Sequence, residues 1–402
     1  MNISFANLCL LRSRTDFSLI IPAYSSFRYL DIRKTSVSRS FSSFLSTNSI
    51  LGVLIKNSYF KQYLSSVIVL NQQEIKYKES FTHTLEMDDG IISIDYCVFV
   101  GCTSNLNGAG CNIVSQGNVS ITNSFFESCR TNAKGGAIYA KINTFIMKSN
   151  CFYLCRCGTP NGSDGSTVYA EATNMINSSL LTCHQCPKHG DMCWYGILNL
   201  WHGELSSEYI NISSSEVEFV AGLAHCQPRN KKSLIKYYMS VNGKTGNSLT
   251  FVNMRFIGQH QYGLIVNNSV KSGLIYFQDS HTVLKEYSFI QNHGPITYMC
   301  VGKSNGVFQN CIFDSDFEKG IGFDSTISCT IERNGFTTLD MKMLNTYVCV
   351  IGSSAFFNMK QTRIPLFYIG GAVFVVLATV TGVHRYFWLW IKRAGSMKRR
   401  EK

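Results

Sequence analysis

IDYCVFVGC (94–102) and TNSFFESC (122–129) are the first two copies of a short repeat that decides the fold. The pattern returns as SNCFYLC (149–155) and NSSLLTC (177–183). Each copy has an aromatic residue or leucine three positions before a cysteine, and the cysteines are 27, 26 and 28 residues apart. Four copies at nearly constant spacing indicate a repeat architecture. The paired positions are Phe99 and Cys102, Phe126 and Cys129, Phe152 and Cys155, and Leu180 and Cys183.

A glycine cluster follows each of the first three copies and leads into a stretch of small apolar residues: NGAGCNIV (107–114), KGGAIYAK (134–141) and DGSTVYAE (164–171). A period near 27 residues is too short for a propeller blade, and the long amphipathic runs of helical repeats are missing. The spacing therefore predicts an all-β fold, a right-handed parallel β-helix in which the chain winds coil upon coil.

Stacking of the coils at about 4.8 Å places equivalent residues above one another. One inward ladder is expected to contain Phe99, Phe126, Phe152 and Leu180, and a second to contain Ala137 and Ile138 with their counterparts. Gly135 and Gly136 are expected at a corner that needs positive φ or a close backbone approach.

The repeat weakens beyond residue 190 but continues, so residues 91–355 are interpreted as one β-helix domain of roughly ten coils. NMRFIGQ (253–259), EYSFIQN (286–292) and NCIFDSD (310–316) keep the aromatic residue. The residue three positions on becomes Gln259, Asn292 or Asp316, which suits a stacked polar ladder. Residues 1–90 carry no clear copy and are interpreted as an irregular N-terminal cap or as early degenerate coils.

Residues 364–383, IPLFYIGGAVFVVLATVTGV, contain no charge. Twenty helical residues measure about 30 Å, the thickness of the hydrocarbon layer of a bilayer, and predict one C-terminal transmembrane α-helix. The tail 384–402 has seven basic residues and one acidic residue, a net +6 of the chain's +12. The positive-inside rule places this tail in the cytosol and the N-terminal domain outside the cell, in a single-pass plasma-membrane protein.

The basic excess is thus partly explained by the lipid bilayer as partner, and no nucleic-acid partner is expected. The chain has 402 residues, of which 15% are charged and sixteen are cysteines.

The N-terminus leaves three alternatives open, because the apolar run 17–21 is shorter than a secretory signal requires. The signal is atypical, the chain is incomplete at this end, or the protein is tail-anchored with a cytosolic domain.

GGAI at 135–138, paired with the upstream F-x-x-[CN] motif, resembles the twin short motif of chlamydial-type polymorphic membrane proteins and of related surface repeat proteins in some protozoa. The likeness covers about 90 residues well and about 260 weakly. NGAG and DGST depart from GGAI, and F-x-x-N occurs strictly only at Phe289 and Asn292. The bacterial family ends in an outer-membrane barrel, whereas this chain ends in one apolar segment and a basic tail. The resemblance implies adhesion as a role. Barrel-dependent secretion is not carried over to this chain.

The repeat cysteines are interpreted as a buried ladder of free thiols, because in-register side chains point the same way and a bridge between them is strained. Disulfides are expected instead in the turn-rich stretch with Cys183, Cys186, Cys193 and Cys226. An alternative interpretation makes Cys183, Cys186, His189 and Cys193 zinc ligands. The absence of a second C-x₂-C pair argues against it, so no metal and no cofactor are predicted.

N-x-[ST] sequons at Asn118, Asn161, Asn177, Asn211 and Asn267 predict N-glycosylation of an extracellular domain, although the tripeptide is also common by chance. Trp194 and Trp201 are candidates for stacking on sugars, with core packing as the alternative.

A carbohydrate-active enzyme, a lyase or hydrolase, needs clustered carboxylates. Asp314 and Asp316 are the candidates, with Arg333 and His293 as companions, and acidic residues on a turn explain them better than catalysis does. The sequence therefore favours a non-catalytic surface protein for adhesion or recognition, whose partner is a host-cell or matrix protein or a glycan. A structural coat or scaffold is the third alternative.

Overall fold

The computed structural model describes residues 2–6, 9–10, 29–47, 52–71, 91–158, 165–188, 196–228, 233–254, 257–271, 273–294, 298–313, 327–331 and 349. The chain divides into two units, Met1–Ser353 and Ser354–Lys402, and all described residues belong to the first. No helix among the described residues could cross a membrane. The predicted span 364–383 and the tail 384–402 lie outside them.

Every element in these ranges is a β-strand. The first coils contain β1 (Asn2–Ala6), β2 (Cys9–Leu10), β3 (Tyr29–Arg33), β4 (Ser36–Ser40), β5 (Leu45–Thr47), β6 (Gly52–Lys56), β7 (Tyr59–Tyr63), β8 (Ile68–Asn71), β9 (Ile91–Asp95), β10 (Val98–Val100) and β11 (Thr103–Ser104). The middle coils contain β12 (Cys111–Val114), β13 (Asn118–Thr122), β14 (Phe125–Glu127), β15 (Arg130–Thr131), β16 (Ile138–Lys148), β17 (Cys151–Tyr153), β18 (Arg156–Cys157), β19 (Val168–His184), β20 (Leu198–Trp201) and β21 (Glu204–Ser213). The last coils contain β22 (Glu216–Cys226), β23 (Ser233–Val241), β24 (Lys244–Val252), β25 (Ile257–Val266), β26 (Ser269–Val270), β27 (Ile275–Gln278), β28 (His281–Ile290), β29 (Tyr298–Val301), β30 (Asn305–Phe313) and β31 (Ile327–Ile331).

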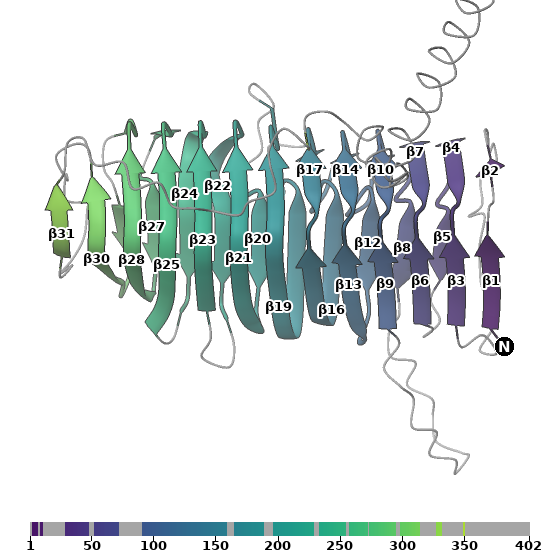
Figure 1. Ribbon diagram of the computed structural model, residues 1–402, viewed down its shortest axis with the longest axis horizontal. Coiled ribbons are helices and arrows are strands. Elements are labelled where there is room, and N and C mark those ends of the chain that lie inside the picture. Colours follow the sequence, from purple (N-terminus) through teal and green to yellow (C-terminus); the bar gives the residue numbers. More distant parts are fainter. Residues whose placement is uncertain are drawn as a thin grey trace, which may run out of the picture. The chain divides into compact units, whose positions relative to one another are not determined.

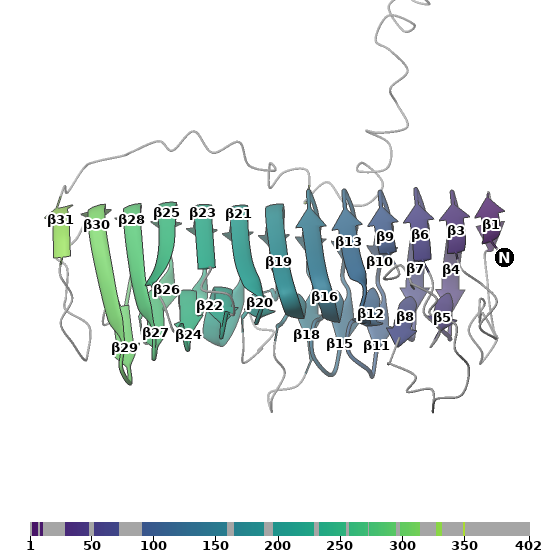
Figure 2. The same ribbon diagram turned by 90° about the horizontal axis from the view of Figure 1, so that it is seen from below.

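The strands stack in parallel from coil to coil, which confirms the predicted all-β parallel solenoid (Figure 1). One row of pairs runs β3–β6–β9–β13–β16–β19–β21–β23–β25–β28–β30. A second row runs β4–β7–β10–β14–β17–β19, and a third runs β5–β8–β12–β16. Seen from below, the rows form separate faces of one column of coils (Figure 2).

Residues 29–47 and 52–71 wind as the later coils do, although no copy of the motif marks them. Strand β6 pairs with β9 in register, and β7 pairs with β10. Phe60 is fully buried and stacks on Phe99 with ring centroids 5.3 Å apart. The column of coils therefore begins well before residue 91, in a stretch where only alternation of apolar residues carries the fold.

The core contains the aromatic ladder that the repeat predicts for its first three copies. The rings of Phe99 and Phe126 lie 4.7 Å apart and 3° from parallel, and Phe126 and Phe152 lie 5.1 Å apart. Each stacked pair adds about 0.5–1.5 kcal/mol beyond the area that it buries. Strand pairing extends this ladder from Phe152 to Cys183.

Leu180 does not belong to the ladder, so this part of the prediction was wrong. It has φ 54° and lies at a corner of the coil, directly before Leu181, which pairs with Ile210. The coil between Phe152 and Cys183 has 31 residues (183 − 152), whereas the cysteine spacing suggested 28. The extra residues shift the fourth copy by three positions, and its leucine matches the pattern only by chance.

A second inward column follows the aromatic one and contains the thiols of Cys102, Cys129 and Cys155, all free and buried. Each thiol donates to a carbonyl of the preceding coil; Cys155 Sγ lies 3.3 Å from the oxygen of Phe126 and Cys129 Sγ lies 3.7 Å from that of Phe99. The fourth member is Cys186, whose sulfur accepts from the Cys155 backbone N–H at 3.3 Å, so the assignment of Cys183 to this column was wrong.

The column becomes polar toward the end of the solenoid. Asn268 Nδ2 lies 3.2 Å from Asn292 Oδ1, and Asn292 in turn donates to the carbonyl of Ile265. This is the stacked amide arrangement expected at Asn292. Gln259 is not part of it, contrary to the prediction, because it lies inside β25 opposite Leu234 and Val283. Asp316 lies outside the described residues.

The disulfides differ from the prediction. Cys183, Cys186 and Cys226 form no disulfide, and Cys193 lies outside the described residues. The structure instead joins Cys151 to Cys349, with Cα atoms 5.7 Å apart. All three cysteines are buried, Cys183 and Cys186 on one coil and Cys226 on another, which removes them from the exposed turns where a bridge was expected.

Thiol titration is expected to leave eleven cysteines unreactive in the folded protein and to count at least eleven thiols after denaturation without reductant, because eleven cysteines of the described residues are buried and form no disulfide. Burial raises the pKa of Cys129, Cys155 and Cys186 well above the usual value, so thiolates do not form at neutral pH. A count of two or fewer after denaturation would contradict the free thiol column.

Gly135 and Gly136 form the turn that leads into β16, and each is required for a different reason. Gly135 has φ +66°, the left-handed region that side chains disfavour. A Cβ on Gly136 would lie 2.3 Å from the Ser166 carbonyl oxygen and 2.5 Å from that of Arg156. Beyond the turn, Ala137 and Ile138 are fully buried, and Ile138 pairs with Cys111 and Val168 in the second inward ladder.

Buried polar side chains, including two histidines, interrupt the apolar core between β19 and β25. His225 is fully buried, with Nε2 2.9 Å from Ser207 Oγ and Nδ1 2.9 Å from Ser233 Oγ. His260 is also fully buried and stacks on Phe251 at 4.6 Å, but neither ring nitrogen has a hydrogen-bond partner. Desolvation by burial lowers the pKa of His225 to about 3 and that of His260 well below its usual value.

Candidate binding ridge

One corner of the solenoid carries a single residue per coil in the left-handed backbone conformation. This column, which we call the first corner, lies between the strands of the first row and those that follow. Asparagine, which tolerates positive φ better than most residues, occupies several of its positions. Its members are Lys34, Asn57, Tyr96, Asn123, Ser149, Leu180, Tyr209, Tyr237, Tyr262, Glu286 and Asn310.

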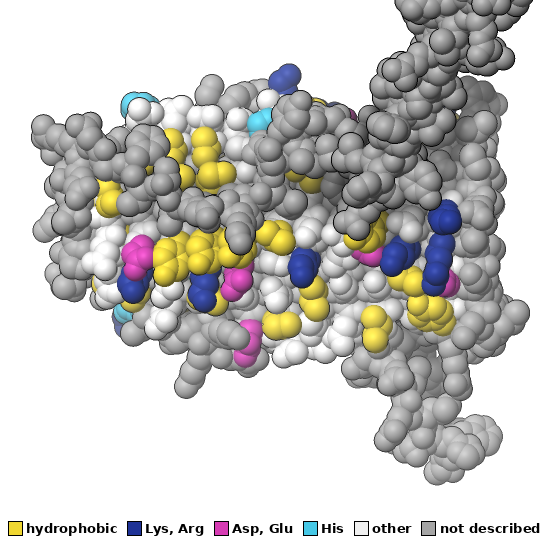
Figure 3. Space-filling model, in the orientation of Figure 1, with side chains coloured by type: hydrophobic (Ala, Val, Ile, Leu, Met, Phe, Trp, Pro, Cys, Tyr) yellow, Lys and Arg dark blue, Asp and Glu magenta, His cyan; other side chains and the backbone are white. Residues whose placement is uncertain are grey.

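Three consecutive coils place tyrosine at this corner. The rings of Tyr209 and Tyr237 lie 4.5 Å apart and 6° from parallel, and those of Tyr237 and Tyr262 lie 5.0 Å apart and 13° from parallel. All three side chains are partly exposed. We call this stack the tyrosine ridge. Space-filling shows a row of hydrophobic side chains here with acidic and basic side chains beside it (Figure 3).

The ridge is held against a backbone preference. A left-handed conformation costs a residue with a Cβ about 1–2 kcal/mol, and bulky residues adopt it rarely. Stacking returns about 0.5–1.5 kcal/mol per pair. Three such residues cost about 3–6 kcal/mol and the two stacked pairs return about 1–3 kcal/mol, so stacking does not exceed the backbone cost. Asparagine, as at Asn57 and Asn123, would satisfy the corner at least as well. Stability alone therefore does not account for three tyrosines in succession.

Charged and amide side chains border the ridge on the strand that precedes the corner. Glu208, Lys236, Gln261 and Lys285 occupy equivalent positions on successive coils. Lys285 Nζ lies 3.3 Å from Glu286 Oε1. The pKa of Tyr209 is raised, first by desolvation and second by the neighbouring Tyr237 and Glu208. Its phenol therefore stays protonated at neutral pH. The ridge thus presents ring edges, hydroxyls, carboxylates and amines in a regular row.

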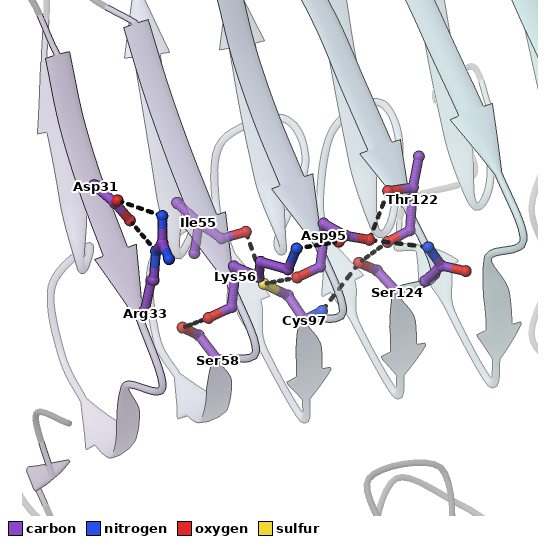
Figure 4. Close-up of polar contacts among 10 residues, drawn as sticks. Asp31, Arg33, Ile55, Lys56, Ser58, Asp95, Cys97, Thr122 and Ser124 are labelled. Atoms are coloured by element: carbon purple, nitrogen blue, oxygen red, sulfur yellow. Dashed lines mark hydrogen bonds and ion pairs between the residues drawn. The ribbon is translucent and has the colours of Figure 1, made fainter. Parts of the chain in front are cut away.

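The N-terminal part of the same corner is already satisfied within the protein. Asp95 accepts from Thr122 Oγ1 at 2.7 Å and Asn123 Nδ2 at 2.9 Å, and Lys56 Nζ lies 3.4 Å from it (Figure 4). Arg33 pairs with Asp31 at 2.8 Å. The groups around Asp95 bind one another across neighbouring coils, and Arg33 and Asp31 bind each other within one strand. This part of the corner therefore offers less to a ligand than the ridge.

A second aromatic cluster lies on β16 and β19. Tyr139 and Tyr169 stack at 5.4 Å, with Lys134 Nζ 4.7 Å from the Tyr169 ring centre. Both rings are only 7% exposed. Lys141 Nζ lies 3.1 Å from Glu171, and His202 Nε2 lies 3.7 Å from the same carboxylate. Its aromatic surface is covered, which leaves the tyrosine ridge as the more accessible candidate site.

Most of the other predicted site residues lie outside the part of the chain that the structure describes. Asp314, Asp316 and Arg333 lie outside the described residues, and His293 is exposed. Of the suggested zinc ligands, Cys183 and Cys186 are buried free thiols, while His189 and Cys193 are outside the described ranges. The described residues contain no group of three or more side chains that could hold a metal ion.

Trp201 and the sequons can be placed in part. Trp201 is half-buried, and its ring lies 6.0 Å from that of His202. Trp194 and Asn161 are outside the described ranges. Asn118 and Asn177 are half-buried and Asn267 is exposed, with its amide donating to Asn242 Oδ1 at 2.7 Å. Asn211 is 1% exposed, which leaves no room for a glycan on its amide.

Sequence reasoning missed Tyr209, Tyr237 and Tyr262 because the repeat was aligned on inward-facing residues. A signal was present: the three tyrosines follow charged or amide residues in EYIN (208–211), KYYM (236–239) and QYGL (261–264). Their separations of 28 and 25 residues (237 − 209 and 262 − 237) match the period of the repeat. Comparison of the chain with protein-family models, curated proteins and solved structures found no match.

Proposed function

We propose that the protein is a non-catalytic recognition protein of the cell surface that binds an extended glycan along the tyrosine ridge. The observation that carries this proposal is the placement of three stacked, partly exposed tyrosines on consecutive coils, in a backbone conformation that favours asparagine. A site maintained against local preference is a reason to infer function at that site.

A polymer with a regular repeat is the ligand class that suits the ridge. The ring separations of 4.5 and 5.0 Å repeat the same hydroxyl and ring edge along the solenoid axis. Extended solenoid faces bind extended partners, and tyrosine combines an apolar body with a polar tip. Glu208, Lys236 and Gln261 add hydrogen-bonding groups beside each ring, which suits the hydroxyls of a sugar chain.

The proposal includes the placement of the protein. The solenoid is right-handed and extracellular, residues 364–383 form the membrane span, and the basic tail is cytosolic. The likeness of GGAI and F-x-x-[CN] to surface repeat proteins supports adhesion as the role. Protease protection of intact cells combined with glycosidase treatment tests the placement: residues 1–363 should be digested from outside, and the tail should survive.

The full-length protein in detergent micelles is expected to bind members of a glycan array, and the triple variant Tyr209→Asn, Tyr237→Asn, Tyr262→Asn is expected to lose about tenfold or more in affinity. Aromatic anchors at binding sites are worth about 2 kcal/mol or more. Asparagine suits the left-handed backbone, so the variant should keep its fold. Leu154→Asn is the matched control. Leu154 also has a left-handed backbone, with φ 54°, but it lies at the corner that follows β17 and not at the ridge.

Equal binding by the triple variant and the wild type would remove the ridge from the proposal. Release of shortened sugar from a bound glycan would instead support the carbohydrate-active alternative, and that activity should then disappear in Asp314→Asn or Asp316→Asn. Absence of any glycan binding, with the tail accessible and the solenoid protected, would favour a cytosolic scaffold.

A further inference from the structure

Five outward-facing residues on consecutive coils are buried although they point away from the core. They alternate along their strands with the inward ladder, and they pair with one another in register. We call this row the outer column. Their exposed fractions are 2% or less for Val98 (0%), Phe125 (0%), Cys151 (2%), Thr182 (0%) and Asn211 (1%).

The burial of this row is local. In the same register, Tyr59 precedes Val98 and Met239 follows Asn211, and both are only half-buried. An outward residue on a single-layer solenoid faces water unless something lies over it. The cover therefore extends over five coils and ends on either side of them.

Cys349 identifies the part of the chain at this position. Its bond to Cys151 brings the two Cα atoms within 5.7 Å, and Cys349 itself is 1% exposed. Cys151 is the central member of the outer column, so Cys349 lies over the middle of the covered row. The sequence around it, TYVCVIG (346–352), is uncharged and apolar.

The chain is long enough to reach this position. Eighteen residues separate Ile331, the end of β31, from Cys349 (349 − 331), and extended they span up to about 60 Å. Seven steps between paired strands lead from β31 back to β17, about 34 Å at 4.8 Å per step. Four such steps across the outer column need about six extended residues, and 346–352 has seven.

We propose that residues 346–352 dock on the outer column as a strap, fastened by the Cys151–Cys349 disulfide. The strap covers the apolar surface of Val98 and Phe125, and it ties the segment ahead of residues 364–383 to the middle of the solenoid and not to its end. The bond forms and persists in an oxidising compartment. This inference is independent of glycan binding at the ridge.

Peptide mapping of the full-length protein under non-reducing conditions tests the bond. A peptide pair joining Cys151 to Cys349 is expected, and it should separate on reduction. Recovery of both cysteines as alkylated free thiols from protein isolated with a thiol-blocking reagent would overturn the fastening.

Labelling of introduced cysteines tests the cover. In full-length protein in micelles, Val98→Cys and Asn211→Cys should resist a bulky maleimide, whereas Met239→Cys, just beyond the covered row, should react at least tenfold faster. Replacing 346–352 by a Gly/Ser segment of equal length should raise the labelling of Val98→Cys and Asn211→Cys to the rate of Met239→Cys. Continued protection would assign the cover to another part of the chain, and rapid labelling before the replacement would show that no cover exists; either overturns the strap.

Discussion

Gly136→Ala is expected to lower the free energy of unfolding by about 3 kcal/mol, more than most surface substitutions in this solenoid. The new Cβ would approach the carbonyl oxygens of Ser166 and Arg156 to 2.3 and 2.5 Å. Both are backbone atoms of stacked coils, so the clash cannot be relieved by a change of rotamer. Urea unfolding of the full-length protein in micelles, followed by circular dichroism, measures the loss.

Gly101→Asn is the matched control for this prediction. Gly101 also lies at a turn, with φ +59°, but the nearest atom to an added Cβ is Gln62 Cγ at 3.7 Å. Asparagine tolerates the left-handed region, so the change should stay within about 0.5 kcal/mol. Equal stability of Gly136→Ala and the wild type would mean that the coils at this turn are not packed as closely as the structure has them.

Mild acid is expected to destabilise the protein by about 4 kcal/mol between pH 7 and pH 5 through His225 and His260. Their folded pKa values lie below the unfolded value of about 6.5, at about 3 for His225. The unfolded chain therefore binds more protons below pH 6.5. Stability is complete above this pH and falls by about 1.4 kcal/mol per unit and per histidine as the pH drops toward 3. Urea unfolding at pH 7, 6 and 5 measures the slope.

His260→Phe separates this effect from the titration of carboxylates. Phenylalanine can keep the stacking on Phe251 and removes two ring nitrogens that have no partner. The variant is expected to be more stable than the wild type and to lose about half of the histidine-dependent slope. An unchanged slope in His260→Phe would contradict the role of this buried ring.

The fold could be predicted from the sequence because stacking imposes a period. An aromatic residue returns at the same place in successive coils, as at Phe99, Phe126 and Phe152. Glycine stands at 135 and 136, where the backbones of stacked coils approach each other closely. Prediction from the repeat period fails where a coil changes length. Leu180 imitates the pattern, but the longer fourth coil places Cys183 in the aromatic ladder.

The candidate site was harder to predict than the core. Outward residues such as Tyr209 and Tyr237 are not required for packing, so their spacing is visible only once the corners are known. The Cys151–Cys349 bond joins residues separated by 198 positions. No local pattern encodes such a contact, because it depends on which coil a distant segment reaches and not on the residues next to either cysteine.

The bond between Cys151 and Cys349 also decides how tension would travel through the protein. A pull on the C-terminal end passes from Cys349 directly to Cys151, and the coils from β19 to β31 lie off the force path. Those coils, which include the tyrosine ridge, can stay folded under a load that the earlier coils must bear. Reduction of this single bond would redirect the same load through β31 and peel the solenoid from its last coil.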